Sequence, residues 1–174
     1  MSKLKPTVNS NDHFQGNPNA PIVLVEYGDY ECPYCERAYA IIKNIQLALD
    51  SNLKFVFRNF PLAEVHSNAT NAAIAAEAAS AQGKFWEMHD ILFKNQHHLG
   101  DASILKYATK IGLNIEQFEA DIKNPQYLEK VELDFESGAR SGVWGTPTFY
   151  INDEVYDGLW EEEYFLEYLQ GLIV

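Results

Sequence analysis

The order of residue patterns predicts a mixed α/β fold in which a block of helices interrupts a central sheet. Near the start of the chain, two short apolar runs flank a helical pattern, and the chain ends with a hairpin pattern and a helix. Residues 61–142, which lie between these two parts, show helical patterns and no strand pattern. We therefore predict a sheet domain made of residues 1–60 and 143–174, with an all-helical insertion at 61–142.

Length and composition exclude several classes of protein. The chain has 174 residues, of which 47% are hydrophobic, as expected for a single domain that carries an insertion. Its net charge is −12, from 13 basic and 25 acidic residues, so we expect it not to bind nucleic acid or anionic membrane surfaces. No apolar stretch reaches the roughly 18 residues of a membrane helix, so we expect no stable membrane insertion.

The first unit of the sheet reads as strand, loop, helix and strand. Apolar and β-branched residues from Pro21 to Tyr27 predict a buried strand, and residues 28–31 form the loop after it. Pro33 suits the first turn of a helix, and the helical period continues to about Asp50. The next strand, at 53–59, follows a helical crossover and should be parallel to the first.

The insertion is predicted to contain five helices, separated by glycine and proline breaks. Asp101 and Asn114 are the expected N-caps of two of them. The first helix is rich in alanine, which lets another element approach closely. The predicted ranges are 69–81, 85–95, 103–111, 115–122 and 126–141.

The end of the chain reads as a hairpin and a helix. Residues 148–151 and 154–156 flank Asn152-Asp153, which predicts two antiparallel strands joined by a two-residue turn. The final helix is expected from Trp160 to Leu172. Three consecutive glutamates lie in its first turn, where carboxylates suit the helix dipole.

Cys32 and Cys35 are the only two cysteines of the chain, in the motif Cys-Pro-Tyr-Cys. A cysteine at the first turn of a helix faces unpaired backbone N–H groups and the positive end of the helix dipole, and both stabilise a thiolate. Cys32 is therefore expected to be the exposed, low-pKa nucleophile. Cys35, one turn later, can close on it, so the pair can alternate between dithiol and disulfide.

A Cys-x-x-Cys pair is also compatible with half of a zinc site. Zinc would need about two further ligands, and His13 and His66 are the first candidates. Neither has a partner histidine at helical spacing. We therefore favour a redox pair and expect no metal.

This arrangement resembles the thioredoxin superfamily. The resemblance rests on the order of elements, on Cys-Pro-Tyr-Cys at a helix start and on Gly-Thr-Pro-Thr-Phe at 145–149. The helical insertion is similar to that of the DsbA-like branch, as are the stretches at 16–21, 58–62 and 83–90. Over roughly residues 13–172, the resemblance implies a thioredoxin fold with a helical insertion domain and thiol–disulfide oxidoreductase activity without a cofactor.

The resemblance also implies roles for residues away from the cysteines. Pro147 matches the cis-proline beside the active-site sulfurs, and Thr146 before it would offer its main chain to an extended substrate. Glu26 matches the acidic position beneath the site, where it would accept a proton from Cys35. An ordinary trans-proline and an exposed glutamate at a strand end are the respective alternatives.

Residues around the motif would tune the thiolate and bind substrate. Pro33 and Tyr34 are assigned to substrate binding, and because the dipeptide lacks histidine we expect a less oxidising pair than the most oxidising relatives. Glu31 should disfavour the thiolate and Arg37 should favour it. His66 either approaches the site and tunes the thiolate, or caps a helix or faces solvent. Aromatic residues that could line an apolar rim, or simply pack, are Tyr30, Tyr34, Phe60 and Trp144.

The predicted function is exchange of disulfides with protein or peptide dithiols and disulfides. Such a protein needs a redox partner, namely glutathione, a thioredoxin-type reductant or, if exported, a quinone-linked membrane oxidant. Two alternatives are a glutathione-linked reductase of small-molecule disulfides and a peptide-binding chaperone on the same fold. Residues 1–10 have no apolar signal segment, so we expect the protein to be cytoplasmic as written, or periplasmic if an export signal has been removed.

Overall fold

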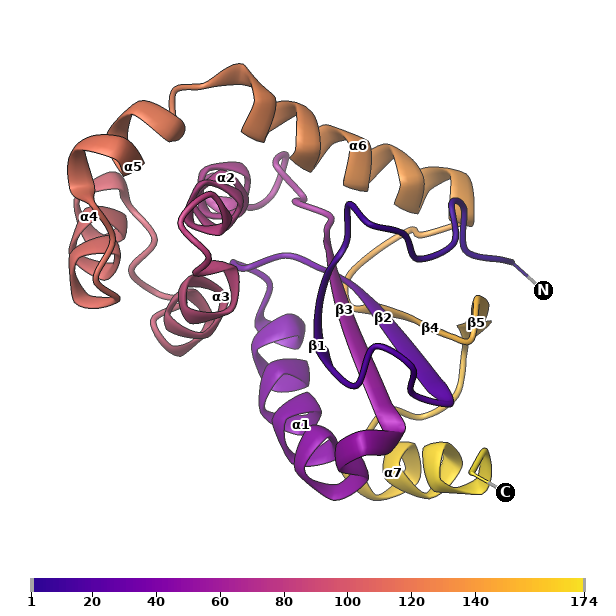
Figure 1. Ribbon diagram of the computed structural model, residues 1–174. Helices are drawn as coiled ribbons and strands as arrows, with labels where there is room; N and C mark the ends of the chain where they lie inside the picture. Colours follow the sequence, from indigo (N-terminus) through magenta and orange to yellow (C-terminus); the bar gives the residue numbers. More distant parts are fainter. Residues whose placement is uncertain (1, 174) are drawn as a thin grey trace.

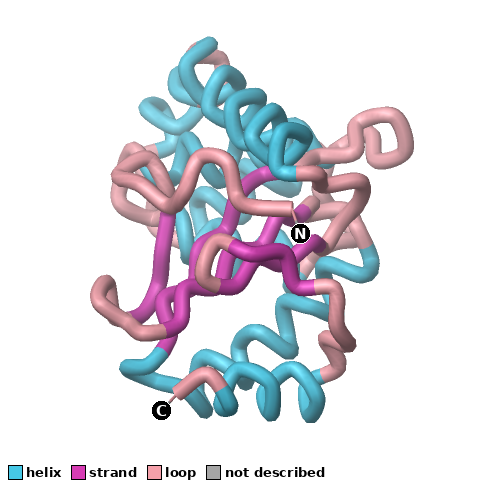
Figure 2. Tube along the Cα trace, turned by 90° about the vertical axis from the view of Figure 1, so that its right-hand side faces the viewer, coloured by secondary structure: helices cyan, strands magenta, loops and turns pink. Residues whose placement is uncertain are grey.

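A five-stranded sheet forms the middle layer of the computed structural model, which describes residues 2–173, and helices lie on both sides of it (Figures 1 and 2). The strand order is β1-β3-β2-β4-β5. β2 and β3 are parallel, and the other neighbours are antiparallel. The strands are β1 (His13–Gly16), β2 (Ile22–Gly28), β3 (Leu53–Asn59), β4 (Thr148–Ile151) and β5 (Glu154–Tyr156). The predicted fold class is confirmed, while the terminal residues of the predicted sheet domain, 1 and 174, lie outside the described range.

The parallel pair is formed by the predicted crossover. Helix α1 (Pro33–Leu49) and a short 3-10 turn connect β2 to β3, close to the predicted boundaries. Strand β1 was not predicted, because its sequence His-Phe-Gln-Gly is short and mostly polar. It pairs with β3 at the edge of the sheet, so its backbone hydrogen bonds, rather than an apolar pattern, define it.

Five helices fill residues 61–142, and no strand occurs there, as predicted. Asn114 caps α5, since its side chain accepts a hydrogen bond from the amide of Gln117 at 2.9 Å. The prediction that Asp101 is an N-cap is wrong: Gly100 holds that position and Asp101 is the first helical residue, where its carboxylate suits the dipole. The helices are α2 (Ala69–Ser80), α3 (Phe85–Lys94), α4 (Asp101–Lys110), α5 (Ile115–Asp121) and α6 (Pro125–Ser141).

The two faces of the sheet pack against different helices. One face packs against α1 and against α7 (Glu162–Gly171), while α6 runs from the cluster of α2 to α5 across the other face (Figure 1). Side chains alternate along β2, so Leu24 belongs to the α1 core and Tyr27 to the α6 side. On α6, a Cβ at Gly138 would lie 2.7 Å from the ring of Phe60, so glycine allows this close approach.

The hairpin at the end of the sheet forms as predicted. Asn152 and Asp153 connect β4 to β5 with φ angles of 49° and 70°, the left-handed values of a tight turn between twisted strands. The outer edge of β5 is covered by the start of the chain, where Lys3 forms a bridge with Glu154 and the amide of Leu4 donates to the carbonyl of Asp153. Helix α7 begins later than predicted, at Glu162.

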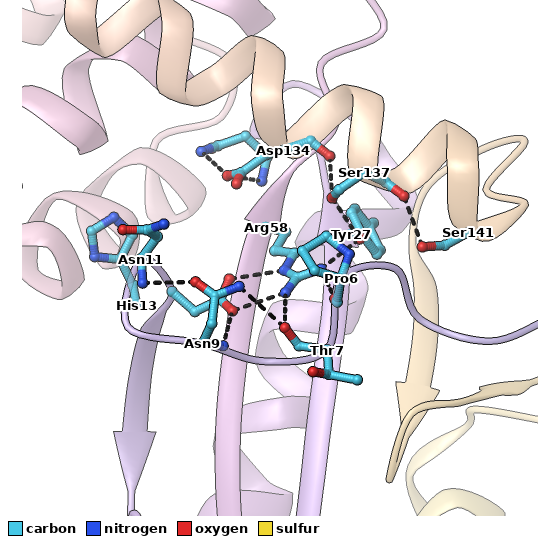
Figure 3. Close-up of polar contacts among 12 residues, drawn as sticks. Pro6, Thr7, Asn9, Asn11, His13, Tyr27, Arg58, Asp134, Ser137 and Ser141 are labelled. Carbon is cyan, nitrogen blue, oxygen red and sulfur yellow. Dashed lines mark hydrogen bonds and ion pairs between the residues drawn. The ribbon is translucent and has the colours of Figure 1, made fainter.

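Arg58 anchors the N-terminal segment to the α6 face of the sheet (Figure 3). Its guanidinium donates to both carboxylate oxygens of Asp12 at 2.8 Å, to the hydroxyl of Tyr27 at 2.9 Å and to the carbonyl of Pro6 at 3.0 Å. The Tyr27 hydroxyl also bonds to Ser137 of α6 at 2.8 Å. This network joins the N-terminal segment, β2, β3 and α6, and only 2% of the Arg58 side chain and 5% of the Asp12 side chain are exposed.

We expect Arg58→Met to lower the free energy of unfolding by about 3–5 kcal/mol, because it leaves the Asp12 carboxylate buried without its partner. Urea unfolding at neutral pH measures this loss. The matched control is Arg37→Met, since the ion pair of Arg37 with Glu161 is half-exposed and should contribute less than about 1 kcal/mol. Equal losses in the two variants would contradict the assignment.

Candidate active site

The two thiols lie where β2 passes through a short loop into α1. Cys32 is the N-cap of α1, Pro33 is its first residue and Cys35 follows one turn later. The carbonyl of Cys32 accepts the amides of Cys35 and Glu36 at 3.0 and 3.2 Å, which starts the helix. Both cysteines are reduced in this structure.

Several hydrogen bonds stabilise the thiolate of Cys32. The thiol of Cys35 lowers the pKa of Cys32 most, and Thr146 and the backbone amides of Cys35 and Tyr34 lower it further, while burial acts in the opposite direction. The net result is a pKa of about 5. Cys32 is therefore ionised at neutral pH, as the sequence predicts for a thiol at a helix N-terminus.

Cys35 has the opposite character. It is fully buried, and burial raises the pKa of its thiol, as do the hydrogen bond to Cys32 and the charges of Glu26 and Cys32. The backbone amide of Asp29, 3.5 Å from its sulfur, lowers this pKa in part. The site thus contains one thiol that is ionised at neutral pH and one whose neutral form is favoured.

Glu26 lies beneath the thiols on the α1 face of the sheet. It is 2% exposed, which rules out the alternative of a solvated glutamate at a strand end. Burial, with the charge of Cys32, raises the pKa of Glu26 to about 8. Gly28 makes room for it, because a Cβ there would lie 3.0 Å from the Glu26 Oε1 and 2.5 Å from the ring of Phe57.

Thr146 and Pro147 face Cys32 from the start of β4. Their peptide bond is cis, and the Thr146 carbonyl lies 3.6 Å from the Cys32 sulfur. The side chains of Pro33 and Tyr34, the two residues between the cysteines, are exposed, and 64% of Tyr34 is accessible to solvent. Cys32 itself is buried, with 4% exposed, so the prediction that it is exposed is wrong. Its sulfur faces the Thr146 carbonyl, and Pro33 and Tyr34 form the open surface next to it.

Two of the four aromatic residues that could line a rim or simply pack, Tyr30 and Phe60, are buried, so the packing alternative holds for them. Tyr30 is 1% exposed, and its hydroxyl bonds to the ring nitrogen of His89 at 3.0 Å within an aromatic cluster. Phe60 is 4% exposed because it packs against α6 and stacks on Phe135. Tyr34 and Trp144 are exposed, the latter by 96%.

The histidines that zinc would need have other partners. His13 pairs with Glu77 and His66 with Asp29, each at 2.8 Å. Across residues 2–173, no group of three or more His, Cys, Asp and Glu side chains is placed to hold a metal ion.

Two residues that hold the active-site loop were not identified from the sequence. Gln96, which follows α3, donates its side-chain amide to the carbonyls of Tyr30 and Cys32 at 3.0 and 2.7 Å. No sequence pattern links Gln96 to a loop more than sixty residues away. Asp29, by contrast, is an acidic residue directly after a buried strand and before the cysteines, and this position could have singled it out.

Arg37 and Glu31 lie near the motif but have partners of their own. Arg37 extends toward Glu161 at 3.8 Å and over the ring of Trp160, so its predicted effect on the thiolate stays a prediction. Glu31 accepts the backbone amide of Asn68 at 2.7 Å.

A family model described as "Thioredoxin" matches residues 8–171. Among solved structures, the fold is similar to that of a thioredoxin-like oxidoreductase from Silicibacter pomeroyi DSS-3, with a TM-score of 0.83, 29% identity and coverage of 94% of this chain and 92% of that one. It is also similar to the thiol-disulfide exchange protein alpha-DsbA2 from Wolbachia pipientis. For that structure the TM-score is 0.82, the identity 24% and the coverage 94% of this chain and 88% of that one.

A curated relative is part of a much longer protein. It is named Na(+)/H(+) antiporter NhaA 1, from Mycobacterium sp. (strain KMS), and is 38% identical over 173 residues, which make up 98% of this chain. The chain spans 28% of the length of that relative. Within residues 2–173, no helix has the length and apolar character to cross a membrane.

Replacing Glu26 should change how stability depends on pH. The folded pKa of about 8 lies above the ordinary value of 4.5, so the folded state holds a proton that the unfolded state loses, and stability falls as pH rises through that window. Between about pH 5 and about pH 8, the wild type should lose roughly 3 kcal/mol more than Glu26→Gln. Urea unfolding of the reduced proteins, with Glu64→Gln as an exposed control, measures this. Parallel pH curves for the wild type and Glu26→Gln would contradict it.

Proposed function

We propose that this chain, which belongs to the thioredoxin family, is a DsbA-like thiol–disulfide oxidoreductase that exchanges disulfides with protein or peptide substrates through Cys32 and Cys35. The observation that carries this proposal is the contrast between the two sulfurs. Cys32 has a pKa of about 5, while burial raises the pKa of Cys35. Such a pair suits an attacking and a resolving thiol.

The first step is attack by the Cys32 thiolate on one sulfur of a substrate disulfide. The substrate S–S bond breaks, its other sulfur leaves as a thiolate that takes up a proton, and Cys32 is joined to the substrate in a mixed disulfide. Thr146 faces Cys32 here, and its main chain would bond to an extended substrate chain, with Pro147 fixing the loop.

The second step uses the buried pair beneath the site. Cys35 gives its proton to Glu26 in those molecules in which Glu26 is ionised. The raised pKa of about 8 makes this carboxylate a strong enough base to take a thiol proton, and the same pKa means that a minority of molecules carry it ionised at neutral pH. The Cys35 thiolate then attacks the sulfur of Cys32, the bond to the substrate breaks and the substrate leaves reduced. Two electrons have passed from the protein to the substrate, and the reverse sequence oxidises a substrate dithiol.

The open surface around Cys32 favours a polypeptide over a small disulfide. Tyr34 is 64% exposed and Trp144 is 96% exposed, and exposed aromatic side chains of this kind suit contact with a partner chain. Pro33, exposed between the cysteines, extends the same surface. A glutathione-linked reductase would instead need contacts specific for one small tripeptide.

The direction of electron flow depends on the reduction potential and on the redox partner. Known pairs of this kind span roughly −270 to −120 mV. A low value suits a cytoplasmic protein reduced by glutathione or a thioredoxin-type reductant. A high value suits an exported protein reoxidised by a quinone-linked membrane oxidant.

Equilibration with glutathione redox buffers tests the proposal. We expect a reversible two-electron couple in the wild type, read as the dithiol fraction by thiol alkylation, and no couple in Cys32→Ser. A wild type without a reversible couple would contradict the redox function. Turnover of glutathione mixed disulfides far above that of protein disulfides would favour the small-molecule alternative, and a Cys32→Ser variant that keeps full biological activity would favour the chaperone.

Cys35→Ser should trap the substrate. Because the resolving thiol is missing, a mixed disulfide between Cys32 and a disulfide-containing protein should accumulate and appear on a non-reducing gel. Cys32→Ser is the matched control and should trap at least tenfold less, since the buried high-pKa Cys35 is a poor nucleophile. Equal trapping by both variants would contradict the assigned roles.

A further inference from the structure

Asp29 places a fully buried carboxylate in the loop before the cysteines. One oxygen accepts the backbone amide of Glu31 at 2.8 Å. The other accepts the backbone amide of Leu62 at 2.9 Å and bonds to the Nδ1 of His66 at 2.8 Å. None of the Asp29 side chain is exposed, whereas 20% of that of His66 is.

The same residue is bonded to both cysteines through its backbone. The amide of Asp29 lies 3.5 Å from the sulfur of Cys35, and its carbonyl accepts the amide of Cys32 at 3.1 Å. The Asp29 carboxylate thus belongs to the loop that leads into Cys32, and a negative charge in this loop disfavours the thiolate unless a cation compensates. Glu31, directly before Cys32, adds a second negative charge.

His66 is placed to compensate these charges. The charged groups that act on it are Asp29 and Glu31 of the loop and Cys32 of α1. Partial burial lowers the pKa of His66, but the hydrogen bond and the charge of Asp29, with those of Cys32 and Glu31, raise it above its ordinary value. Arg37, the other cation near the motif, extends toward Glu161.

We propose that His66 is a positioning residue of the redox site, which as an imidazolium holds Asp29, neutralises its charge and thereby stabilises the Cys32 thiolate. The proposal rests on the proposed function and deepens it. The segment before α2 would thus supply the positive charge that Pro33 and Tyr34 lack.

The expected effect on the redox couple follows from the thiolate. Stabilising the thiolate lowers the free energy of the reduced form, so His66 makes the disulfide form more oxidising. The coupling is reciprocal: if the imidazolium lowers the pKa of Cys32, the Cys32 thiolate raises the pKa of His66 by the same amount. Oxidation removes the thiolate and should therefore lower the pKa of His66.

His66→Asn separates charge from hydrogen bonding, because the asparagine amide can donate to Asp29 much as Nδ1 does but carries no charge. In glutathione buffers we expect the variant to favour its disulfide form about threefold to tenfold more than the wild type, where tenfold corresponds to about 30 mV. The thiolate absorbance of Cys32 should titrate about half to one unit higher. His97→Asn, at an exposed histidine, is the matched control and should change neither value.

The pKa of His66, measured by NMR in the oxidised and reduced protein, distinguishes an electrostatic role from a merely structural one. A structural role would leave this pKa the same in both redox states. The ring signals of His66, assigned by triple-resonance experiments on the wild-type protein, should titrate at a lower pH in oxidised than in reduced wild-type protein, while those of His97 should not shift. If His66→Asn does not fold, this wild-type comparison still decides.

The proposal is overturned if the wild type shows a reversible couple and His66→Asn has the same Cys32 titration and the same glutathione equilibrium as the wild type. It is equally overturned if the pKa of His66 is the same in both redox states. A wild type without any reversible couple would instead contradict the proposed function itself.

Discussion

The buried carboxylate of Asp29 connects the parts of the molecule that form the redox site. Its oxygens bind the loop that carries Cys32 and the segment that leads into α2, while its backbone bonds to both cysteines. Gln96 adds a second attachment from the end of α3, through the carbonyls of Tyr30 and Cys32. The position of the nucleophile therefore depends on contacts with residues far along the chain, and not on α1 alone.

The two faces of the sheet differ in whether their buried ionisable groups are neutral or charged. On the α1 face, Glu26 and Cys35 are buried without a cation, so their neutral forms are favoured, and burial likewise lowers the pKa of His89. On the α6 face, Arg58 and Asp12 are buried as a bonded ion pair. The two faces therefore have different roles: proton transfer needs groups with shifted pKa values, whereas attachment of a segment needs permanent charges.

Sequence patterns predict the frame of the fold and the reacting residues, because both depend on local rules. The apolar runs of β2 and β3, the turn at Asn152 and the helix start at Cys32 each follow from neighbouring residues. Strand β1 could not be predicted this way, since its pairing with β3 defines it. The sequence could not decide between a rim and packing for Tyr30 and Phe60, and it did not reveal Gln96. The reason is the same: their surroundings involve α3 and α6, which only the tertiary structure brings close.

The pairing of residues 2–4 with β5 affects association between molecules. An uncovered edge strand offers free amide and carbonyl groups to any extended chain, including another copy of itself. Here those groups are bonded to the start of the same chain, and Leu4 is buried against the sheet. A chain shortened by four residues would therefore expose the edge of β5 and aggregate more readily. Its thiols, which lie at the start of α1, would keep their chemistry.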